Sequence, residues 1–313
     1  MRQASRPGRL AGLQDSQHLR AAETARRRTP WWLAVLVTLG IFFIGVVAGV
    51  VRFPPPDNPS ALTTALFFLP ALVMPYGVRI LLVWLWVARY EGRGFRTLSF
   101  PKGDAVLALR GMAVGLVVTG AMVALVAAFG GETERTAQPG FSGVSALAGT
   151  LITLVGWSVQ STTEEILYRG FALQALARYG VWIGIAGTAA IFVFVHQAAL
   201  ANPLAAFNLF LAGVMFALYV LREGGLWGAC GLHAMSNWVQ NSLFGFAVSG
   251  QEIPGGSLFA LQTRGNPLLT GGDYGIEASL PGTVVVLAVI AILLALPNRD
   301  RNRTPTGSVG PTA

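Results

Sequence analysis

Apolar residues run along the chain in long stretches that short polar connections separate. Most stretches hold about twenty residues, roughly the length that an α-helix needs to cross the hydrocarbon core of a bilayer. The pattern therefore predicts an all-α fold, a polytopic transmembrane bundle of about eight membrane-spanning helices. The eight predicted segments are residues 31–51, 61–88, 105–129, 144–177, 181–200, 203–221, 226–248 and 281–296.

Two of these segments depart from a simple straight helix. The second contains Pro70 and Pro75, so we expect a kink or a tilt there. The fourth is more than thirty residues long, and we expect it to bend or to project from the bilayer.

The basic residues predict how the segments are oriented. If every segment spans once, the basic residues fall almost entirely on one side of the membrane, whereas the loops 52–60, 130–143 and 249–280 on the other side are poor in them. The positive-inside rule places the basic side, and with it both termini, in the cytoplasm. The basic positions are the N-terminal tail, the loop 89–102, Arg178, Arg222 and the tail from Arg299 to Arg303.

Composition supports this class of protein. The chain has 313 residues, of which 53% are hydrophobic and only 12% charged, whereas a soluble domain carries about a quarter charged residues. The net charge of +8 comes from topology-determining arginines, so we expect no nucleic-acid partner. The Arg-rich, Lys-poor composition suggests a bacterial source, and we expect an integral protein of the bacterial cytoplasmic membrane.

The same pattern divides the chain into three parts. Residues 1–30 hold seven arginines and little that could form a core, which predicts a disordered basic cytoplasmic tail. Residues 31–297 are the eight-helix transmembrane domain. Residues 298–313 are expected to be a cytoplasmic C-terminal tail.

The fourth segment contains charged residues within the sequence GWSVQSTTEEILYRG, residues 156–170. Ionisable groups in a membrane segment cost roughly 2.5–3.5 kcal/mol each on insertion scales, so they are candidates for a functional site. On an α-helix Glu165 and Arg169 are four residues apart, the spacing of an ion pair. Glu164 is turned by about 100° from that pair. This geometry predicts that Arg169 neutralises Glu165, while Glu164 faces a cavity.

Further polar residues occur in two other membrane segments. His196 follows Phe192 by four residues in the fifth segment, and His233 precedes Asn237 by four residues in the seventh. A single histidine in a membrane more often makes only a hydrogen bond between helices. Several such groups on three helices each need a partner that lipid cannot supply, which predicts one shared, water-filled cavity. Trp157 is a further candidate for its lining, as is Asn208.

These residue types suit hydrolysis of an amide bond without a serine or cysteine nucleophile. A carboxylate beside an imidazole can hold a water molecule and accept its proton. An asparagine amide and a second imidazole can donate hydrogen bonds to a developing oxyanion. No cofactor is required for this chemistry. The less favoured alternative is a zinc ion held by Glu164, His196 and His233, although the usual HExxH spacing is absent.

The polar residues form three short motifs, in order, on three membrane segments, and together they resemble the CPBP family of intramembrane proteases. This family, also called ABI, comprises the CAAX prenyl endopeptidases and their bacterial relatives. The resemblance covers a core of about residues 144–248. The motifs are EExxxR (Glu164, Glu165, Arg169), FxxxH (Phe192, His196) and HxxxN (His233, Asn237).

The resemblance implies a role for each site residue. Glu164 and His196 would activate the water, and His233 and Asn237 would stabilise the oxyanion. Glu165 and Arg169 would support the site. Family members are often labelled metalloproteases or metallo-endopeptidases, although the structurally examined ones look like glutamate-type enzymes.

We therefore predict a membrane-embedded endopeptidase whose partners are the lipid bilayer and a membrane-embedded or lipidated peptide or protein substrate. The alternative is a non-catalytic protein, a transporter or a bacteriocin-immunity or scaffold factor, that uses the same polar cavity for binding. Arg79 and Arg110 lie near segment ends and are expected to extend toward the cytoplasmic face.

Overall fold

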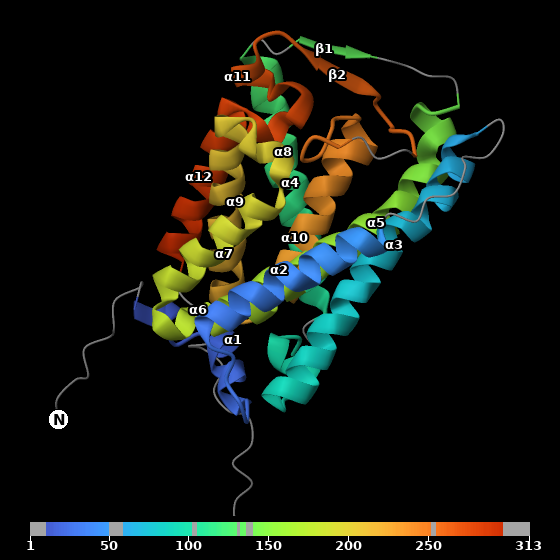
Figure 1. Cartoon of the computed structure of the whole chain (residues 1–313). Helices are drawn as coiled ribbons and strands as arrows, with labels where there is room; N and C mark the ends of the chain where they lie inside the picture. The colour runs from blue at the N-terminus through green and yellow to red at the C-terminus, as the bar shows by residue number, and fades with distance from the viewer. Residues whose placement is uncertain are drawn as a thin grey trace, which may run out of the picture.

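The computed structural model describes residues 11–49, 59–101, 105–129, 132–135, 140–251 and 255–296. The predicted all-α fold is confirmed, with one pair of short strands added at an end of the bundle (Figure 1). The elements are α1 (Gln17–Arg20), α2 (Trp31–Ala48), α3 (Ala61–Leu85), α4 (Val106–Ala128), β1 (Glu132–Arg135), α5 (Leu147–Glu164), α6 (Leu173–Leu176), α7 (Val181–Val195), α8 (Gln197–Leu200), α9 (Pro203–Glu223), α10 (Trp227–Trp238), β2 (Leu261–Arg264), α11 (Pro267–Thr270) and α12 (Leu280–Ala295).

Three of these helices continue into π-helical turns, in which the hydrogen bonds run from residue i to i+5. Trp86–Glu91 extends α3, Glu165–Ala172 extends α5 and Val239–Phe244 extends α10. The second of these turns contains the charged motif of the predicted site.

Within the described residues, five helical runs are long and apolar enough to cross a membrane. Helices α7 and α12 are apolar but shorter, with 15 and 16 residues. Eight spanning helices are therefore not shown, and that number stays a prediction. The five runs are Trp31–Ala48, Ala61–Glu91, Val106–Ala128, Gly143–Tyr179 and Pro203–Glu223.

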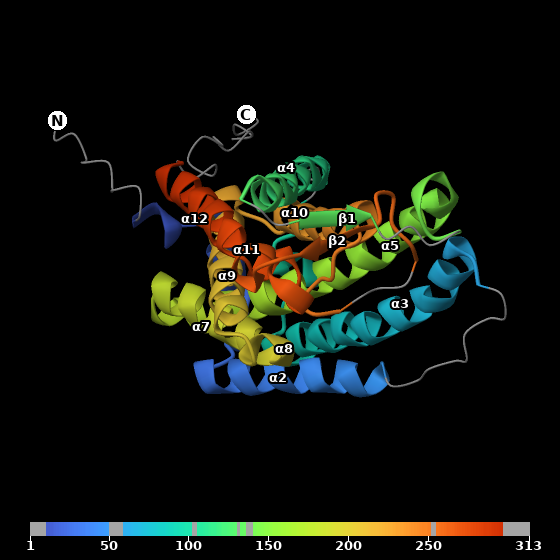
Figure 2. The same cartoon turned by 90° about the horizontal axis from the view of Figure 1, so that it is seen from above.

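The helices pack in two groups. Seen from above, α2, α3, α5, α10 and α4 follow one another across the molecule, each in contact with the next (Figure 2). Helix α9 packs against α7 on one side and α12 on the other. The long run 143–179 exceeds the roughly 20 residues needed to span, and α5 accordingly crosses the bundle obliquely (Figure 1).

Helices α4 and α10 approach each other at backbone distance. A Cβ atom on Gly111 would overlap the carbonyl oxygen of Gly228, and one on Gly231 would overlap that of Ala108. Small residues at such crossings are the usual means of close helix packing in membranes. The close packing places α10, which carries His233 and Asn237, in the interior of the bundle.

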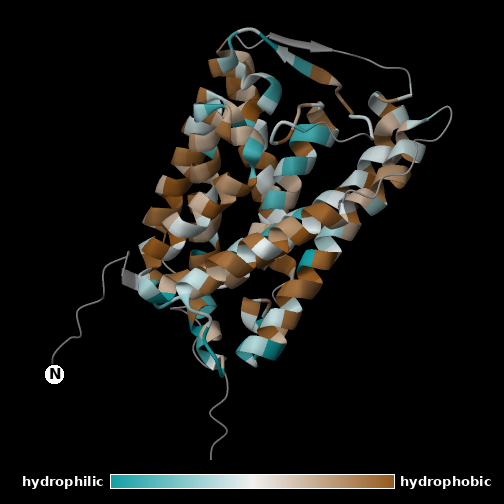
Figure 3. Cartoon of the chain, in the orientation of Figure 1, coloured by the Kyte–Doolittle hydropathy of each residue, from teal (hydrophilic) through white to brown (hydrophobic). Residues whose placement is uncertain are grey.

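Hydrophobic residues predominate along the helices (Figure 3), and many of their large apolar side chains are exposed. Val47 of α2 is 71% exposed and Val117 of α4 is 69% exposed, although both are strongly hydrophobic side chains. Lipid contact removes the cost that such exposure has in water. Together with the apolar spans, this surface indicates an integral membrane protein.

The segment before the first span is folded from residue 11 onward. Ser16 Oγ donates a hydrogen bond to the carbonyl of Leu221 at 2.8 Å, and His18 Nε2 donates one to the carbonyl of Arg169 at 2.8 Å. Leu221 lies in the last turn of α9, and Arg169 lies in the π-helical turn that extends α5. The expected disorder therefore does not hold for residues 11–30, because polar side chains fix this segment to the bundle. Residues 1–10 and the C-terminal tail 298–313 lie outside the described part of the chain.

Different segments lie at the two ends of the bundle. Helices α1 and α6 lie at one end and the β1–β2 pair at the other (Figure 1). The α1 end also holds Arg93, whose guanidinium binds Glu91 at 2.7 Å and Gln174 Oε1 at 2.8 Å. At the far end β1 pairs antiparallel with β2 and so joins the two long loops.

Candidate active site

The site is centred on the junction where α5 changes from α-helix to π-helix. Glu164 is the last residue of the α-helical part, and Glu165 is the first residue of the π-helical turn. Insertions of this kind are rare and often lie at functional sites. The junction carries both carboxylates into the interior, where Glu164 is 6% and Glu165 0% exposed.

Glu165 is held by two partners. Its Oε1 accepts hydrogen bonds from Arg169 Nη1 at 3.1 Å and from His233 Nδ1 at 3.0 Å. The expected ion pair with Arg169 is therefore present, with both side chains fully buried. Glu165 also reaches the predicted site, because it binds the imidazole of His233, whose other nitrogen faces Glu164.

His233 has a fixed orientation. A carboxylate oxygen can only accept a hydrogen bond, so Nδ1 of His233 carries a proton. The ring also stacks on Phe216, with centroids 4.7 Å apart. These contacts leave Nε2 directed toward Glu164, at 3.9 Å from its Oε2.

His196 is also fixed in one tautomer when it is neutral. It follows the last residue of α7, and its Nδ1 donates a hydrogen bond to the carbonyl of Phe192 at 2.8 Å. The Phe192 ring packs on the imidazole, with centroids 4.5 Å apart. Because Nδ1 bears the proton, Nε2 has a free lone pair that can accept a proton.

Two side chains of α5 orient the amide of Asn237. Its Nδ2 donates a hydrogen bond to Gln160 Oε1 at 3.1 Å and lies 3.5 Å from Ser161 Oγ. Gln160 precedes Glu164 by one helical turn and was not singled out from the sequence. Its spacing of four residues on the same helix face is the signal that could have identified it.

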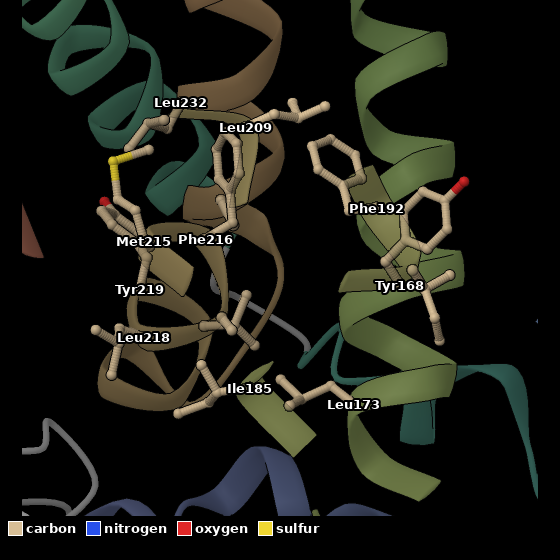
Figure 4. Close-up of a cluster of buried hydrophobic side chains, with 14 of the residues drawn as sticks. Tyr168, Leu173, Ile185, Phe192, Leu209, Met215, Phe216, Leu218, Tyr219 and Leu232 are labelled. Atoms are coloured by element: carbon tan, nitrogen blue, oxygen red, sulfur yellow. The ribbon is translucent and has the colours of Figure 1, made fainter. Parts of the chain in front are cut away.

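The four predicted catalytic residues line one cavity of about 470 Å³. Glu165 and Arg169 lie behind this cavity and are not part of its lining, whereas the two further candidates, Trp157 and Asn208, do line it. Phe192 and Phe216 form an apolar part of the cavity wall. Figure 4 shows Phe192 beside Tyr168, and the centroids of these two rings are 5.3 Å apart. The residues that meet here are Glu164, His196, His233 and Asn237.

Arg79 lies in the same cavity, which corrects the expectation that it extends toward the membrane face. The residue is 5% exposed and its guanidinium lies over the rings of Phe42 and Tyr76. The neighbouring helix α2 covers the side chain and keeps it inside the bundle. Arg110 pairs instead with Glu223 of α9.

A zinc site does not fit this arrangement. In the described ranges, no three histidine, cysteine, aspartate or glutamate side chains lie close enough together to hold a metal ion. Glu164, His196 and His233 therefore share a cavity without forming a ligand set.

Fold and site define a helical membrane protein with an interior cavity that presents a carboxylate, two imidazoles and an amide. Residues 146–239 match the family model described as "Type II CAAX prenyl endopeptidase Rce1-like". This part of the chain is thus an Rce1-like CAAX endopeptidase domain of the CPBP family, as its motifs predicted. The match runs from the start of α5 to the end of α10 and contains all six residues of the predicted site. The family implies a membrane peptidase with protein or peptide substrates.

Searches of curated proteins and of solved structures give no match to this chain.

Proposed function

We propose that the protein is a glutamate-type intramembrane endopeptidase that hydrolyses a peptide bond in a membrane-embedded or lipidated substrate. The observation that carries the proposal is the convergence of Glu164, His196, His233 and Asn237 on one interior cavity. Glycine-mediated packing and fixed histidine tautomers hold these groups in place before a substrate binds, which is the condition for electrostatic catalysis.

Glu164 and His196 activate the water. The Oε2 atom of Glu164 is buried and has no hydrogen-bond partner among the described residues. His196 Nε2 has a free lone pair, as its neutral tautomer requires. A water molecule held between a carboxylate and such an imidazole can transfer a proton to either group as its oxygen attacks the substrate carbonyl.

His233 and Asn237 stabilise the oxyanion that this attack produces. The Nδ1 proton of His233 is committed to Glu165, so Nε2 can donate only when the ring is an imidazolium. In that form Nδ1 still donates to Glu165, and Nε2 lies 3.9 Å from Glu164 Oε2 at the cavity wall. For Asn237, the long approach to Ser161 leaves one Nδ2 hydrogen weakly engaged and able to turn to the oxyanion.

Collapse of the tetrahedral intermediate completes the reaction. The C–N bond breaks, and the proton taken from water passes to the departing amine. The products are a new carboxyl terminus and a new amino terminus. Every proton in this cycle comes from water and returns to the product, so the reaction needs no oxidant or reductant.

We also propose that α7, α10 and α12 cross the membrane with the five longer runs, giving eight spans with both termini in the cytoplasm of a bacterium. Helix α10 needs less apolar surface than the others because protein surrounds it. Single cysteines placed in successive loops and labelled with a membrane-impermeant maleimide report the side of each loop. Labelling of β1 and β2 on opposite sides of the membrane would contradict this topology.

Comparative proteomics of membrane fractions tests the activity. Cells that carry the natural chain should contain peptide fragments that are missing from cells with Glu164→Gln and from cells with Asn237→Ala. Glu23→Gln is the matched control, since Glu23 is exposed and lies outside the bundle. If Asn237→Ala keeps full function while Glu164→Gln abolishes it, proton-coupled binding or transport becomes the better account. Identical fragments in all cells would contradict the protease proposal.

A further inference from the structure

Arg79 is a charged group in the cavity that the proposed reaction does not use. It lies on α3, is 5% exposed and lines the same cavity as Glu164 and His233. A buried arginine within a membrane segment is costly, and such residues are usually paired or functional. The positive charge of this guanidinium therefore needs a partner.

The chain itself supplies little compensation. Nη2 donates a hydrogen bond to the carbonyl of Phe42 at 3.3 Å, and the guanidinium also hydrogen-bonds the Tyr76 hydroxyl. Its Nε is buried without a hydrogen-bond partner. None of the ion pairs formed by the described residues includes Arg79. A guanidinium has five N–H donors in a planar fork that matches a carboxylate. Arg79 thus has unused donors inside the cavity.

The surroundings hold this guanidinium in one place. Its Cζ is 4.7 Å from the centre of the Phe42 ring and 4.8 Å from that of the Tyr76 ring. Aromatic rings stabilise the cation through its flat faces and leave the N–H groups at its edge available. The bundle therefore presents a fixed cation to whatever enters the cavity.

A glycine on α2 makes room for the side chain. A Cβ atom on Gly45 would overlap Arg79 Nε and would come within 2.6 Å of its Cγ. Any larger residue at this position must displace the arginine. A substitution at Gly45 should therefore displace the Arg79 side chain while the arginine itself is kept.

We propose that Arg79 binds a carboxylate of the substrate peptide and so selects peptides that carry a carboxylate close to the scissile bond. The peptide nature of the ligand rests on the proposed function. The carboxylate follows from the unpaired guanidinium, since an anion that enters the cavity satisfies its charge and its free donors together. Two sources share this chemistry, the α-carboxylate at a peptide's C-terminus and the side chain of an aspartate or glutamate.

Matched peptides test the inference in proteoliposomes that contain the full chain. A library of apolar fluorogenic peptides is made with a C-terminal acid, with a C-terminal carboxamide, and with a carboxamide plus one internal glutamate. A hydrogen bond to a charged group corresponds to a preference of about 10- to 100-fold in kcat/KM for a carboxylate-bearing peptide over the plain carboxamide. Preference for the C-terminal acid identifies the α-carboxylate as the group that Arg79 binds, and preference for the peptide with an internal glutamate identifies a side-chain carboxylate.

Variants assign this preference to Arg79. In Arg79→Gln, and in Gly45→Ala, the acid-to-amide ratio should fall to about one. Arg79→Lys keeps the charge without the fork and should retain part of the preference; it serves also if Arg79→Gln fails to fold. An unchanged ratio in Arg79→Gln, or an equal loss on acid and amide peptides, would overturn the inference, because the latter means that Arg79 acts only through Glu164 or the fold.

A binding arm separates this inference from the proposed function. Fluorescence anisotropy measures how labelled acid and amide peptides bind to Glu164→Gln, and to the same chain with Arg79→Gln added, in nanodiscs. Acid-selective binding that depends on Arg79, without cleavage by the natural chain, would leave the inference standing and remove the protease proposal. Glu164-dependent cleavage without any acid preference would do the reverse.

Discussion

Arg169 and Arg79 are both buried in the bundle, but the protein treats them differently. Arg169 is fully buried, pairs with Glu165 at 3.1 Å and lies behind the cavity. Arg79 lies in the cavity wall, between aromatic rings, and forms no ion pair with a described residue. The contrast indicates that a buried cation whose charge the fold compensates positions other groups, whereas one left uncompensated is available to a ligand.

The two glutamates show the same contrast. Glu165 binds Arg169 and His233, while Glu164 has an oxygen without a partner and faces the cavity. Adjacent carboxylates thus receive different tasks because different side chains reach them. One holds an imidazole in place and the other remains free to react.

The largest effect is expected at the free carboxylate. Glu164→Gln removes the group that accepts the proton of water, and the cleavage rate should fall about 10²- to 10⁴-fold, the usual contribution of general acid–base catalysis. The free energy of unfolding should change little, because few contacts depend on this carboxylate. Peptide hydrolysis and chemical unfolding, both measured in detergent, check the two statements. Loss of folding in Glu164→Gln would show that this residue is structural and would break the contrast with Glu165.

Removing the paired arginine should instead damage the fold. Arg169→Ala leaves Glu165 buried beside a single imidazole, and breaking a buried ion pair typically costs about 3–5 kcal/mol of stability. Arg79→Gln is the matched comparison and should lose clearly less stability, since no buried carboxylate depends on Arg79. Unfolding by denaturant gives both values. Equal losses for the two variants would contradict the distinction between the two arginines.

Acid should weaken the attachment of the N-terminal segment to the backbone of Arg169. Burial lowers the pKa of His18 from 6.5 to about 3, and the folded state therefore holds the ring neutral. Its Nδ1 atom is buried without a hydrogen-bond partner in the described structure, as a neutral Nε2–H tautomer allows. The unfolded state gains a proton below pH 6.5 while the folded state does not, so stability is lost as the pH falls from about 6.5 toward 3.

Between pH 7 and pH 5 this histidine alone should reduce the free energy of unfolding by about 2 kcal/mol. His18→Gln cannot take up the proton and should lack this part of the pH dependence. Denaturant unfolding of both chains at the two pH values measures the difference, which cancels the contribution of other groups. Parallel pH dependences would mean that His18 is not held neutral by the fold.

A smaller effect is expected where a residue only positions another. Gln160→Ala frees the Asn237 amide from its fixed orientation and should lower kcat about 10-fold with little change in KM. Gln160→Glu keeps an acceptor for Asn237 Nδ2 and should recover part of the rate. Steady-state kinetics on one peptide substrate measures both variants. A change in KM alone would assign Gln160 to substrate binding.

The sequence could predict the grouping of the four candidate catalytic residues, and the structure brings them to one cavity. Intramembrane polar side chains need partners, and this requirement alone gathers Glu164, His196, His233 and Asn237. It could also predict the Glu165–Arg169 pair from helical spacing. It could not predict the bond from Glu165 to His233, because spacing within one helix does not show which other helix approaches it.

Other features depend on tertiary contacts that composition does not reveal. Arg79 is close enough to a segment end to suggest that its side chain extends toward the membrane surface. Only its close contact with Gly45 of α2 shows that the side chain turns into the bundle. The basic N-terminal segment has the composition of a disordered tail, yet two of its side chains bind backbone carbonyls of α9 and of the π-helical turn that extends α5. Apolar length overestimates how far α7 extends, since this helix ends at Val195 and not at residue 200, whereas α12 has the predicted length of 16 residues.

The most direct test of the central claim is peptide cleavage in ¹⁸O-labelled water, with the chain and the Glu164→Gln variant in proteoliposomes. The substrate is a peptide identified in the membrane proteomics, and mass spectrometry detects the label. The account predicts one ¹⁸O atom in the new C-terminal carboxyl group for the natural chain and almost no product for the variant. Labelled product formed at the same rate by both chains would contradict it.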